Sequence, residues 1–293
     1  MEILSCENVA FKYNESTDYA ISDCTFSVKK GEKIMLCGAS GSGKSTLLRL
    51  LKRELSPRGE LSGNITLMGK DRSELSDRES AEKIGFVMQS PDSQTVCDKV
   101  SAELAFGLES FGVKSGEIQS RVGEMAAFFG IEPLYDRDIS TLSGGQKQLV
   151  ALCSVMATDP DILLLDEPTA QLDPVAAREL LGILDRLNKE MGVTIIIAEH
   201  DPEELFDSCD KILYLAKGKT EFFGTPALTA KYFVENALEG FLPETAKVFA
   251  RLCDDLPLNV RQGRAKLEKL GVTDIPKPVS YTHLRAHETT LHL

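Results

Sequence analysis

The chain has 293 residues, 42% of them hydrophobic, which is enough for one large domain or two modest ones. Its 33 basic and 45 acidic side chains give a formal net charge of −12. Such a chain is poorly suited to binding nucleic acid through a broad basic face, or to adhering to anionic lipid by charge alone. No run of apolar residues approaches the ~20 needed to span a bilayer, and the N-terminus lacks the pattern of a secretory signal. Action at a membrane is therefore expected to need a partner.

The chain begins with segments of strand character, predicted at residues 3–11, 20–28, 33–37 and 64–68. A helix is predicted over 44–54, and the middle of the chain, about 90–158, is expected to be mainly helical. Seven scattered cysteines without C-x-x-C spacing are interpreted as reduced thiols.

Strand patterns return at 162–165 and 194–198, on either side of a helix that Asp173 and Pro174 are well suited to begin. This alternation predicts a parallel α/β core. A hairpin is predicted over 211–223, and residues from about 225 to 278 are expected to form an appended helical segment. The chain shows no internal repeat, so one set of nucleotide-site motifs is expected.

The last fifteen residues, 279–293, differ from the rest. They hold three of the four histidines, and His283 and His287 could share a helix face and bind a metal. The segment also resembles translated sequencing-adapter read-through. We interpret it as a non-native tail and exclude it from the argument.

A glycine-rich loop follows the apolar strand 33–37 and precedes the predicted helix. It matches G-x-x-x-x-G-K-[ST], the pattern of a phosphate-binding loop. Glycine allows backbone N–H groups to turn toward phosphate oxygens, and the helix N-terminus adds a positive dipole. Lys44 is expected to neutralise the β- and γ-phosphates and Ser45 to bind Mg²⁺. The predicted nucleotide-binding residues are Gly38, Ala39, Ser40, Gly41, Ser42, Gly43, Lys44, Ser45 and Thr46.

Two carboxylates end the apolar strand 162–165. Asp166 is predicted to lie near Mg²⁺ and to bind it through water, and Glu167 to polarise the attacking water as a general base. Taken alone, the segment could also be a buried strand with a solvated acidic end.

Residues 142–146, Leu-Ser-Gly-Gly-Gln, form a second glycine-backed loop at the start of a helix, and therefore a second anion site. One ATP does not need two such loops from one chain. We therefore expect this loop to bind, in trans, the ATP of a partner subunit. The residues assigned to this contact are Ser143, Gly144, Gly145 and Gln146.

The motif set resembles that of ATP-binding-cassette (ABC) ATPases over about residues 1–225. The resemblance implies a P-loop α/β core with a parallel sheet, an N-terminal antiparallel β subdomain, a helical signature subdomain at about 90–158, and a small helical extension at 226–278. It also implies that Tyr13 stacks on the adenine, with Tyr19 as the competing aromatic, and that Gln89 links Mg²⁺ and the γ-phosphate. Asp173 is expected to lie at the dimer interface, and His200 to contact the γ-phosphate.

The stretch around Gln89 is similar to that of energy-coupling-factor ATPases, as are residues 242–245 and 256–264. That resemblance implies uptake of a vitamin, metal ion or other micronutrient, and makes Asp92 and Gln94 candidates for contact with a membrane subunit. A solvent-exposed turn is the alternative for those two residues. Leu149 departs from the family, which usually has arginine there.

The resemblance therefore implies an ATPase, with ATP and Mg²⁺, at the cytoplasmic face of the cell membrane. The implied partners are a second ATPase subunit (the same chain or a paralogue), a transmembrane coupling subunit and a membrane substrate-binding component, without nucleic acid. A soluble ABC ATPase acting in translation or DNA repair is the main alternative, and a small-molecule kinase is a third.

Overall fold

The computed structural model describes residues 1–200, 202–250, 252–253 and 255–269. Residues 270–278 of the predicted extension and the 279–293 tail, with His283 and His287, lie outside the described residues.

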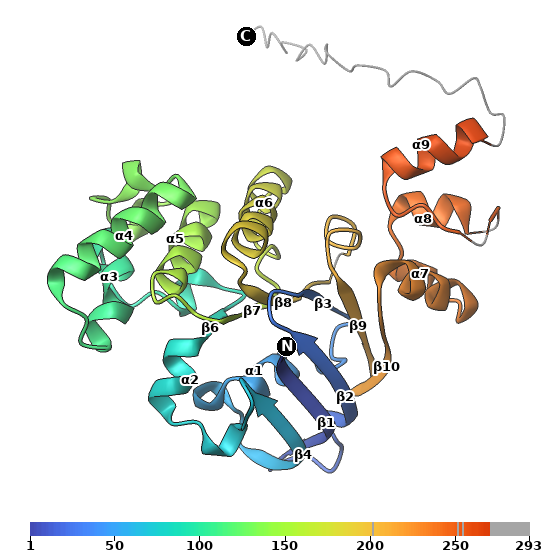
Figure 1. The fold of residues 1–293 in the computed structure, drawn as a ribbon, viewed down its shortest axis with the longest axis horizontal. Coiled ribbons are helices and arrows are strands. Elements are labelled where there is room, and N and C mark those ends of the chain that lie inside the picture. The colour runs from blue at the N-terminus through green and yellow to red at the C-terminus, as the bar shows by residue number, and fades with distance from the viewer. Residues whose placement is uncertain (201, 251, 254, 270–293) are drawn as a thin grey trace, which may run out of the picture.

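A six-stranded sheet forms the centre of the molecule (Figure 1), with the order β10-β9-β3-β8-β7-β6. Its strands are parallel except β10, which pairs antiparallel with β9 as the predicted hairpin. The strand bounds are β3 (Lys33–Cys37), β6 (Ile84–Val87), β7 (Ile162–Asp166), β8 (Thr194–Ala198), β9 (Lys211–Ala216) and β10 (Lys219–Gly224).

An antiparallel sheet of four strands, β2-β1-β4-β5, lies beside the central sheet. Its strands are β1 (Glu2–Tyr13), β2 (Ile21–Lys29), β4 (Gly59–Leu67) and β5 (Lys70–Asp71). The helix α1 (Lys44–Leu51) packs between the two sheets, and a second short helix, α2 (Asp77–Lys83), precedes β6.

The side chains of each central strand alternate between two hydrophobic cores, as the period of two in a strand requires. In β3, Ile34 and Leu36 join the core that contains α1 and the antiparallel sheet. Met35 and Cys37 join the opposite core, beneath the helices. Because both faces are covered, the parallel strands are mainly apolar, with polar residues such as Lys33, Asp166 and Thr194 at their ends.

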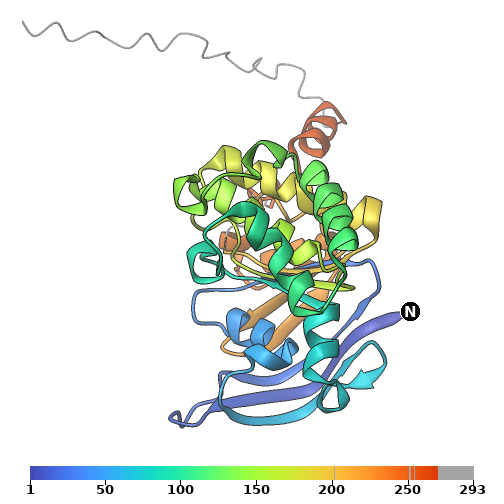
Figure 2. The same cartoon turned by 90° about the vertical axis from the view of Figure 1, so that its left-hand side faces the viewer.

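The helical subdomain contains α3 (Val100–Ser110), α4 (Ser115–Phe129) and α5 (Gly144–Met156), and α6 (Pro174–Met191) follows β7. Figure 2 shows this subdomain from its own side, with the antiparallel sheet beneath it. The C-terminal helices are α7 (Pro226–Glu235), α8 (Glu244–Phe249) and α9 (Val260–Lys269). Phe233 of α7 is fully buried against Phe206 and Tyr214, so α7 packs directly on the central α/β core at β9.

The larger differences from the predicted elements concern α1, β4 and β6. The helix predicted over 44–54 ends at Leu51, and a 3₁₀ turn (Arg53–Leu55) follows it. The strand predicted over 64–68 begins earlier, at Gly59, because its exposed polar half pairs with the end of β1. The short strand β6 was not predicted, although all four of its residues are buried. Four apolar residues are too few to show a period.

Within the described part of the chain, no helix is both long enough and apolar enough to cross a bilayer.

Candidate functional site

The phosphate loop joins β3 to α1 with the geometry that its glycines require. Gly43 has φ +103°, and a side chain there would place Cβ 2.7 Å from the carbonyl oxygen of Ala20. A Cβ at Gly38 would collide with the carbonyl oxygen of Leu215. Both positions therefore exclude any other residue, and the loop closes tightly around the N-terminus of α1.

Lys44 is the first residue of α1 and is only 4% exposed. Its Nζ donates to the carbonyl oxygens of Gly38 (2.8 Å) and Ala39 (3.2 Å), and lies 3.8 Å from Oε1 of Glu167. An ammonium with three donors held at the mouth of the loop is placed to move onto phosphate oxygens.

Ser45 and Asp166 meet beside the loop, where the Ser45 hydroxyl donates to Oδ1 of Asp166 over 2.7 Å. Asp166 is the buried last residue of β7, so the strand carries its carboxylate to the loop. The next residue, Glu167, accepts a hydrogen bond at Oε2 from Nε2 of Gln89 over 3.1 Å. Four predicted site residues thus converge at the carboxyl ends of β6 and β7.

The arrangement fits a phosphate and a hard cation. The buried hydroxyl of Ser42 has no hydrogen-bond partner among the described residues, as expected for a donor reserved for a ligand. The described part of the chain contains no cluster of three Asp, Glu, His or Cys side chains that could hold a metal. A Mg²⁺ site to which Ser45, Gln89 and Asp166 contribute, with phosphate and water as further ligands, stays a prediction.

His200 is exposed and follows Glu199, directly after β8. In register, Ala198 of β8 pairs with Asp166 of β7, which places His200 at the same edge of the sheet as the carboxylates. Its γ-phosphate contact stays a prediction.

Tyr13 ends β1, is 36% exposed, and its hydroxyl lies 2.9 Å from Oγ1 of Thr46. It packs edge-on against Phe11, with ring centroids 5.0 Å apart. The competing aromatic, Tyr19, is 57% exposed. The bond to Thr46 therefore connects Tyr13 directly to the phosphate loop.

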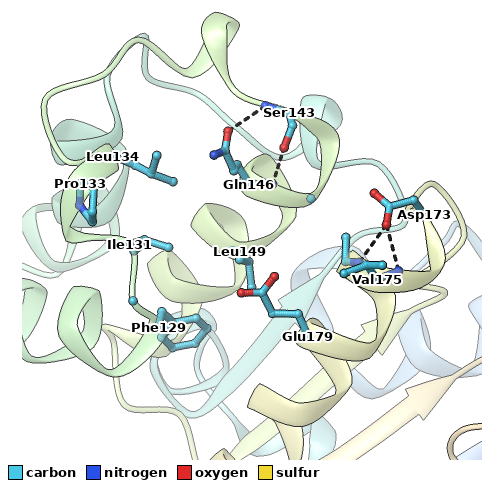
Figure 3. Close-up of a pocket in the computed structure, with 13 residues that line it drawn as sticks. Phe129, Ile131, Pro133, Leu134, Ser143, Gln146, Leu149, Asp173, Val175 and Glu179 are labelled. Carbon is cyan, nitrogen blue, oxygen red and sulfur yellow. Dashed lines mark hydrogen bonds between the residues drawn. The ribbon is translucent and has the colours of Figure 1, made fainter. Parts of the chain in front are cut away.

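The second glycine-backed loop begins α5, and its hydrogen bonds form a capping box. Ser143 Oγ accepts from the Gln146 N–H over 3.3 Å, and Gln146 Oε1 accepts from the Ser143 N–H over 3.0 Å (Figure 3). Because Ser143 Oγ is used as an acceptor, its O–H remains a donor for an anion. Gly144 is the first residue of the helix.

This loop opens onto a cleft of about 480 Å³, into which Asp173 and Glu179 of the α6 region also face. Asp173 caps α6 by accepting from the N–H groups of Val175 (2.9 Å) and Ala176 (3.0 Å). Gly145 also lines the cleft. Within the described chain, none of its thirteen lining residues comes from the phosphate loop. The two glycine-rich loops therefore do not share this cleft.

Asp92 and Gln94 follow β6 in a 3₁₀ turn and have different surroundings. The exposed Asp92 accepts from Lys147 of α5 over 2.6 Å. The Gln94 side chain accepts from the Met88 N–H (2.9 Å) and donates to the Phe86 carbonyl oxygen (3.1 Å). Gln94 thus also shapes the loop that holds Gln89, and the membrane contact of both residues stays a prediction.

Glu199, which is not among the predicted site residues, is 5% exposed. Its Oε1 accepts from the Thr169 N–H (3.2 Å) and hydroxyl (2.8 Å). Burial raises the pKa of Glu199 to about 7, the hydrogen bonds from Thr169 oppose the rise, and the charge of Glu167 adds to it. The sequence offered one signal for this residue, because Glu199 is a carboxylate that directly follows the apolar strand ending at Ala198.

Comparisons with known proteins agree on one family. The family model described as "ABC transporter" matches residues 21–170. A Bacillus thuringiensis subsp. konkukian protein named as an ABC transporter ATP-binding protein is 40% identical over 93% of this chain. The chain spans about half the length of that relative, and likewise half of the Bacillus anthracis and Bacillus cereus relatives that it matches.

Solved structures agree with the same family. One similar structure is CbiO1 from Clostridium perfringens, described as part of the ABC transporter complex CbiONQ. It has a TM-score of 0.72 and 32% sequence identity, and the match covers 90% of this chain and 98% of the CbiO1 chain. The cassette MJ0796, solved as a dimer with ADP and phosphate, has a TM-score of 0.66 and 27% identity, covering 76% of this chain and 99% of its own.

The raised pKa of Glu199 predicts a pH dependence of stability. Between its ordinary pKa of 4.5 and about 7, the folded state keeps a proton that the unfolded state has released. The contribution of Glu199 to the stability of the folded state is therefore fully present below pH 4.5 and is lost as pH rises toward 7. Urea unfolding measures the free energy of unfolding. Between pH 5 and pH 8, this free energy should fall by on the order of 1–3 kcal/mol more for the wild type than for Glu199→Gln. If the free energy of unfolding changed with pH in the same way for both proteins, the raised pKa of Glu199 would be contradicted.

Proposed function

This chain belongs to the ABC transporter ATP-binding proteins, and we propose that it is the ATP-hydrolysing subunit of an uptake transporter of the energy-coupling-factor type. One observation carries the proposal: the chain has two glycine-rich loops, each at the N-terminus of a helix, that do not line the same cleft. A chain with two such loops is completed by a second ATPase subunit, either a copy of itself or a paralogue.

In the proposed dimer, ATP binds the phosphate loop of one subunit, and Ser143 to Gln146 of the opposing subunit close over the γ-phosphate. The fold likeness to the dimeric cassette MJ0796 supports this arrangement. The position of Asp173 beside the Ser143 loop, on the same cleft, supports a place for it at the dimer interface. Closure excludes water from the site and completes the set of reacting groups.

Within one subunit, each residue has a distinct role. Lys44 leaves its two loop carbonyls to bind phosphate oxygens, and Glu167 takes a proton from the attacking water. Gln89, which already donates to Glu167, orients that water, and His200 stabilises charge on the γ-phosphate. Ser45 and Gln89, with Asp166 through water, would hold Mg²⁺, which would supply positive charge beside the β- and γ-phosphates. Tyr13 stacks on the adenine.

A separate apolar groove is our proposed contact for the transmembrane subunit. It has a volume of about 290 Å³ and is lined by Met88 and Gln94 of the Gln89 loop and by Val96 and Phe106. Val96 is 64% and Phe106 46% exposed, so the groove presents apolar surface to solvent. A coupling helix seated here would touch the loop that carries Gln89, and Asp92 would contact it at the rim.

The proposed assembly lies at the cytoplasmic face of the membrane, with this subunit attached through its partners. The likeness to CbiO1, described as part of a transporter complex, supports the energy-coupling-factor type. The proposed cargo is a vitamin, a metal ion or another micronutrient, bound by a membrane component. We further propose that residues 1–225 form the nucleotide-binding domain and 226–278 the extension that helps two ATPases pair.

Glu167→Gln should bind ATP but hydrolyse it at least a hundredfold more slowly, because an amide cannot accept the proton of the attacking water. Size-exclusion chromatography with ATP and Mg²⁺ should show an accumulated closed dimer. The control Lys44→Ala should bind ATP weakly and form no such dimer. Near-normal turnover by Glu167→Gln would contradict the role of this residue.

Phe106→Glu should disrupt the docking of the membrane subunit, because it places a charge in the apolar groove. Affinity purification of tagged protein from detergent-solubilised membranes should recover a polytopic membrane protein with the wild type and lose it with Phe106→Glu. Leu61→Glu is the matched control, since Leu61 is 39% exposed on β4, away from the groove, and it should retain the partner. Equal recovery with all three proteins would exclude the groove as the docking site.

A further inference from the structure

Glu199 is a buried carboxyl at the edge of the nucleotide site with no role in the mechanism above. It lies between the last residue of β8, Ala198, and the exposed His200. Its Oε1 accepts two hydrogen bonds from a single residue, Thr169, one from the backbone N–H and one from the hydroxyl. A buried carboxyl costs free energy unless hydrogen bonds satisfy it, and here Thr169 supplies two of them.

Thr169 belongs to the turn that begins with Glu167, the proposed general base. Glu167 has φ +47°, a left-handed conformation that is uncommon for a residue with a side chain. Such a conformation persists only where the surroundings hold it. Two anchors hold this turn to the end of β8: the Glu167 N–H donates to the Ala198 carbonyl oxygen (2.9 Å), and the Thr169 N–H donates to Glu199.

The same turn continues toward the proposed dimer interface. The Leu172 N–H donates to the Thr169 carbonyl oxygen over 3.0 Å, and the next residue is Asp173. The Thr169 position therefore connects the base to the segment that leads into the partner-facing cleft.

We propose that Glu199 is a positioning residue for ATP hydrolysis, which holds Thr169 so that the Glu167 carboxylate faces the attacking water. The proposal rests on the proposed function, since it assigns a role within the same ATPase site. Glu199 acts through Thr169, so it should affect the rate of the chemical step and leave ATP binding by the phosphate loop unaffected.

The chemistry that Thr169 needs is an acceptor oxygen, and it does not need a negative charge. The raised pKa of Glu199 agrees with this, because a neutral carboxyl keeps a carbonyl oxygen that can accept both bonds. Glutamine keeps that oxygen at nearly the same place, whereas alanine removes it. Thr169→Val removes one of the two donors and keeps the shape of the side chain.

The experiment is steady-state ATP hydrolysis by the full chain, with kcat and KM for ATP measured separately. We expect Glu199→Ala to lower kcat at least tenfold and Thr169→Val to lower it three- to tenfold, with KM within about twofold of wild type. Glu199→Gln should keep kcat within about threefold. The double variant Glu199→Ala/Thr169→Val should be no slower than Glu199→Ala alone, since both changes remove the same contact.

Thr194→Val is the matched control, because it removes a hydrogen-bonded threonine hydroxyl at the opposite end of β8, away from Glu167. The buried Thr194 hydroxyl accepts from the Gly31 N–H over 3.0 Å. The control should lower the unfolding temperature and leave kcat unchanged. Should Glu199→Ala fail to fold, Thr169→Val and Glu199→Gln still decide the matter.

Unchanged kcat in Thr169→Val, or a Glu199→Gln enzyme as slow as Glu199→Ala, would overturn the positioning role. The second result would instead make the charge of Glu199 the important property. A wild-type chain that hydrolyses no ATP in any assembly would overturn the proposed function itself, which is a distinguishable outcome.

Discussion

The parallel register of three central strands is the constraint on which the site depends. Leu36 of β3 and Asp166 of β7 both pair with Ala198 of β8, so the three strands end at one level. The phosphate loop, the two carboxylates and the His200 segment all begin where those strands end. Because the strands are buried on both faces, their register cannot slip without exposing apolar side chains. The core therefore sets the positions of charged groups that local structure could not hold together.

Three features at this edge of the sheet are unfavourable for folding. Lys44 is almost fully buried, Glu167 has a left-handed backbone, and Glu199 is a carboxyl with little access to solvent. Each departs from what folding alone favours, and each is supported by a hydrogen bond to a neighbouring strand end or loop. Departures of this kind are expected where a protein is organised for chemistry.

The sequence predicted the phosphate loop, the strand that carries Asp166 and the second glycine-backed loop, because each is a local pattern with a physical meaning. It could not predict β6, whose four apolar residues show no period. Nor could it predict that Gln94 bonds to the Met88 and Phe86 backbone, or that Glu199 reaches Thr169, thirty residues away. Those contacts exist only once the strands are in register. The ABC transporter fold itself was predicted and is confirmed by the solved structures.

In the proposed dimer, residues from two subunits together form each ATP site. The most direct measurement mixes two inactive variants, Lys44→Ala and Ser143→Arg. A mixed dimer contains one site with both defects and one site with neither, so ATPase activity should reappear on mixing, at up to half the activity of the wild-type dimer. If Ser143 instead served the ATP of its own chain, every site would carry one defect, and mixing would restore no activity.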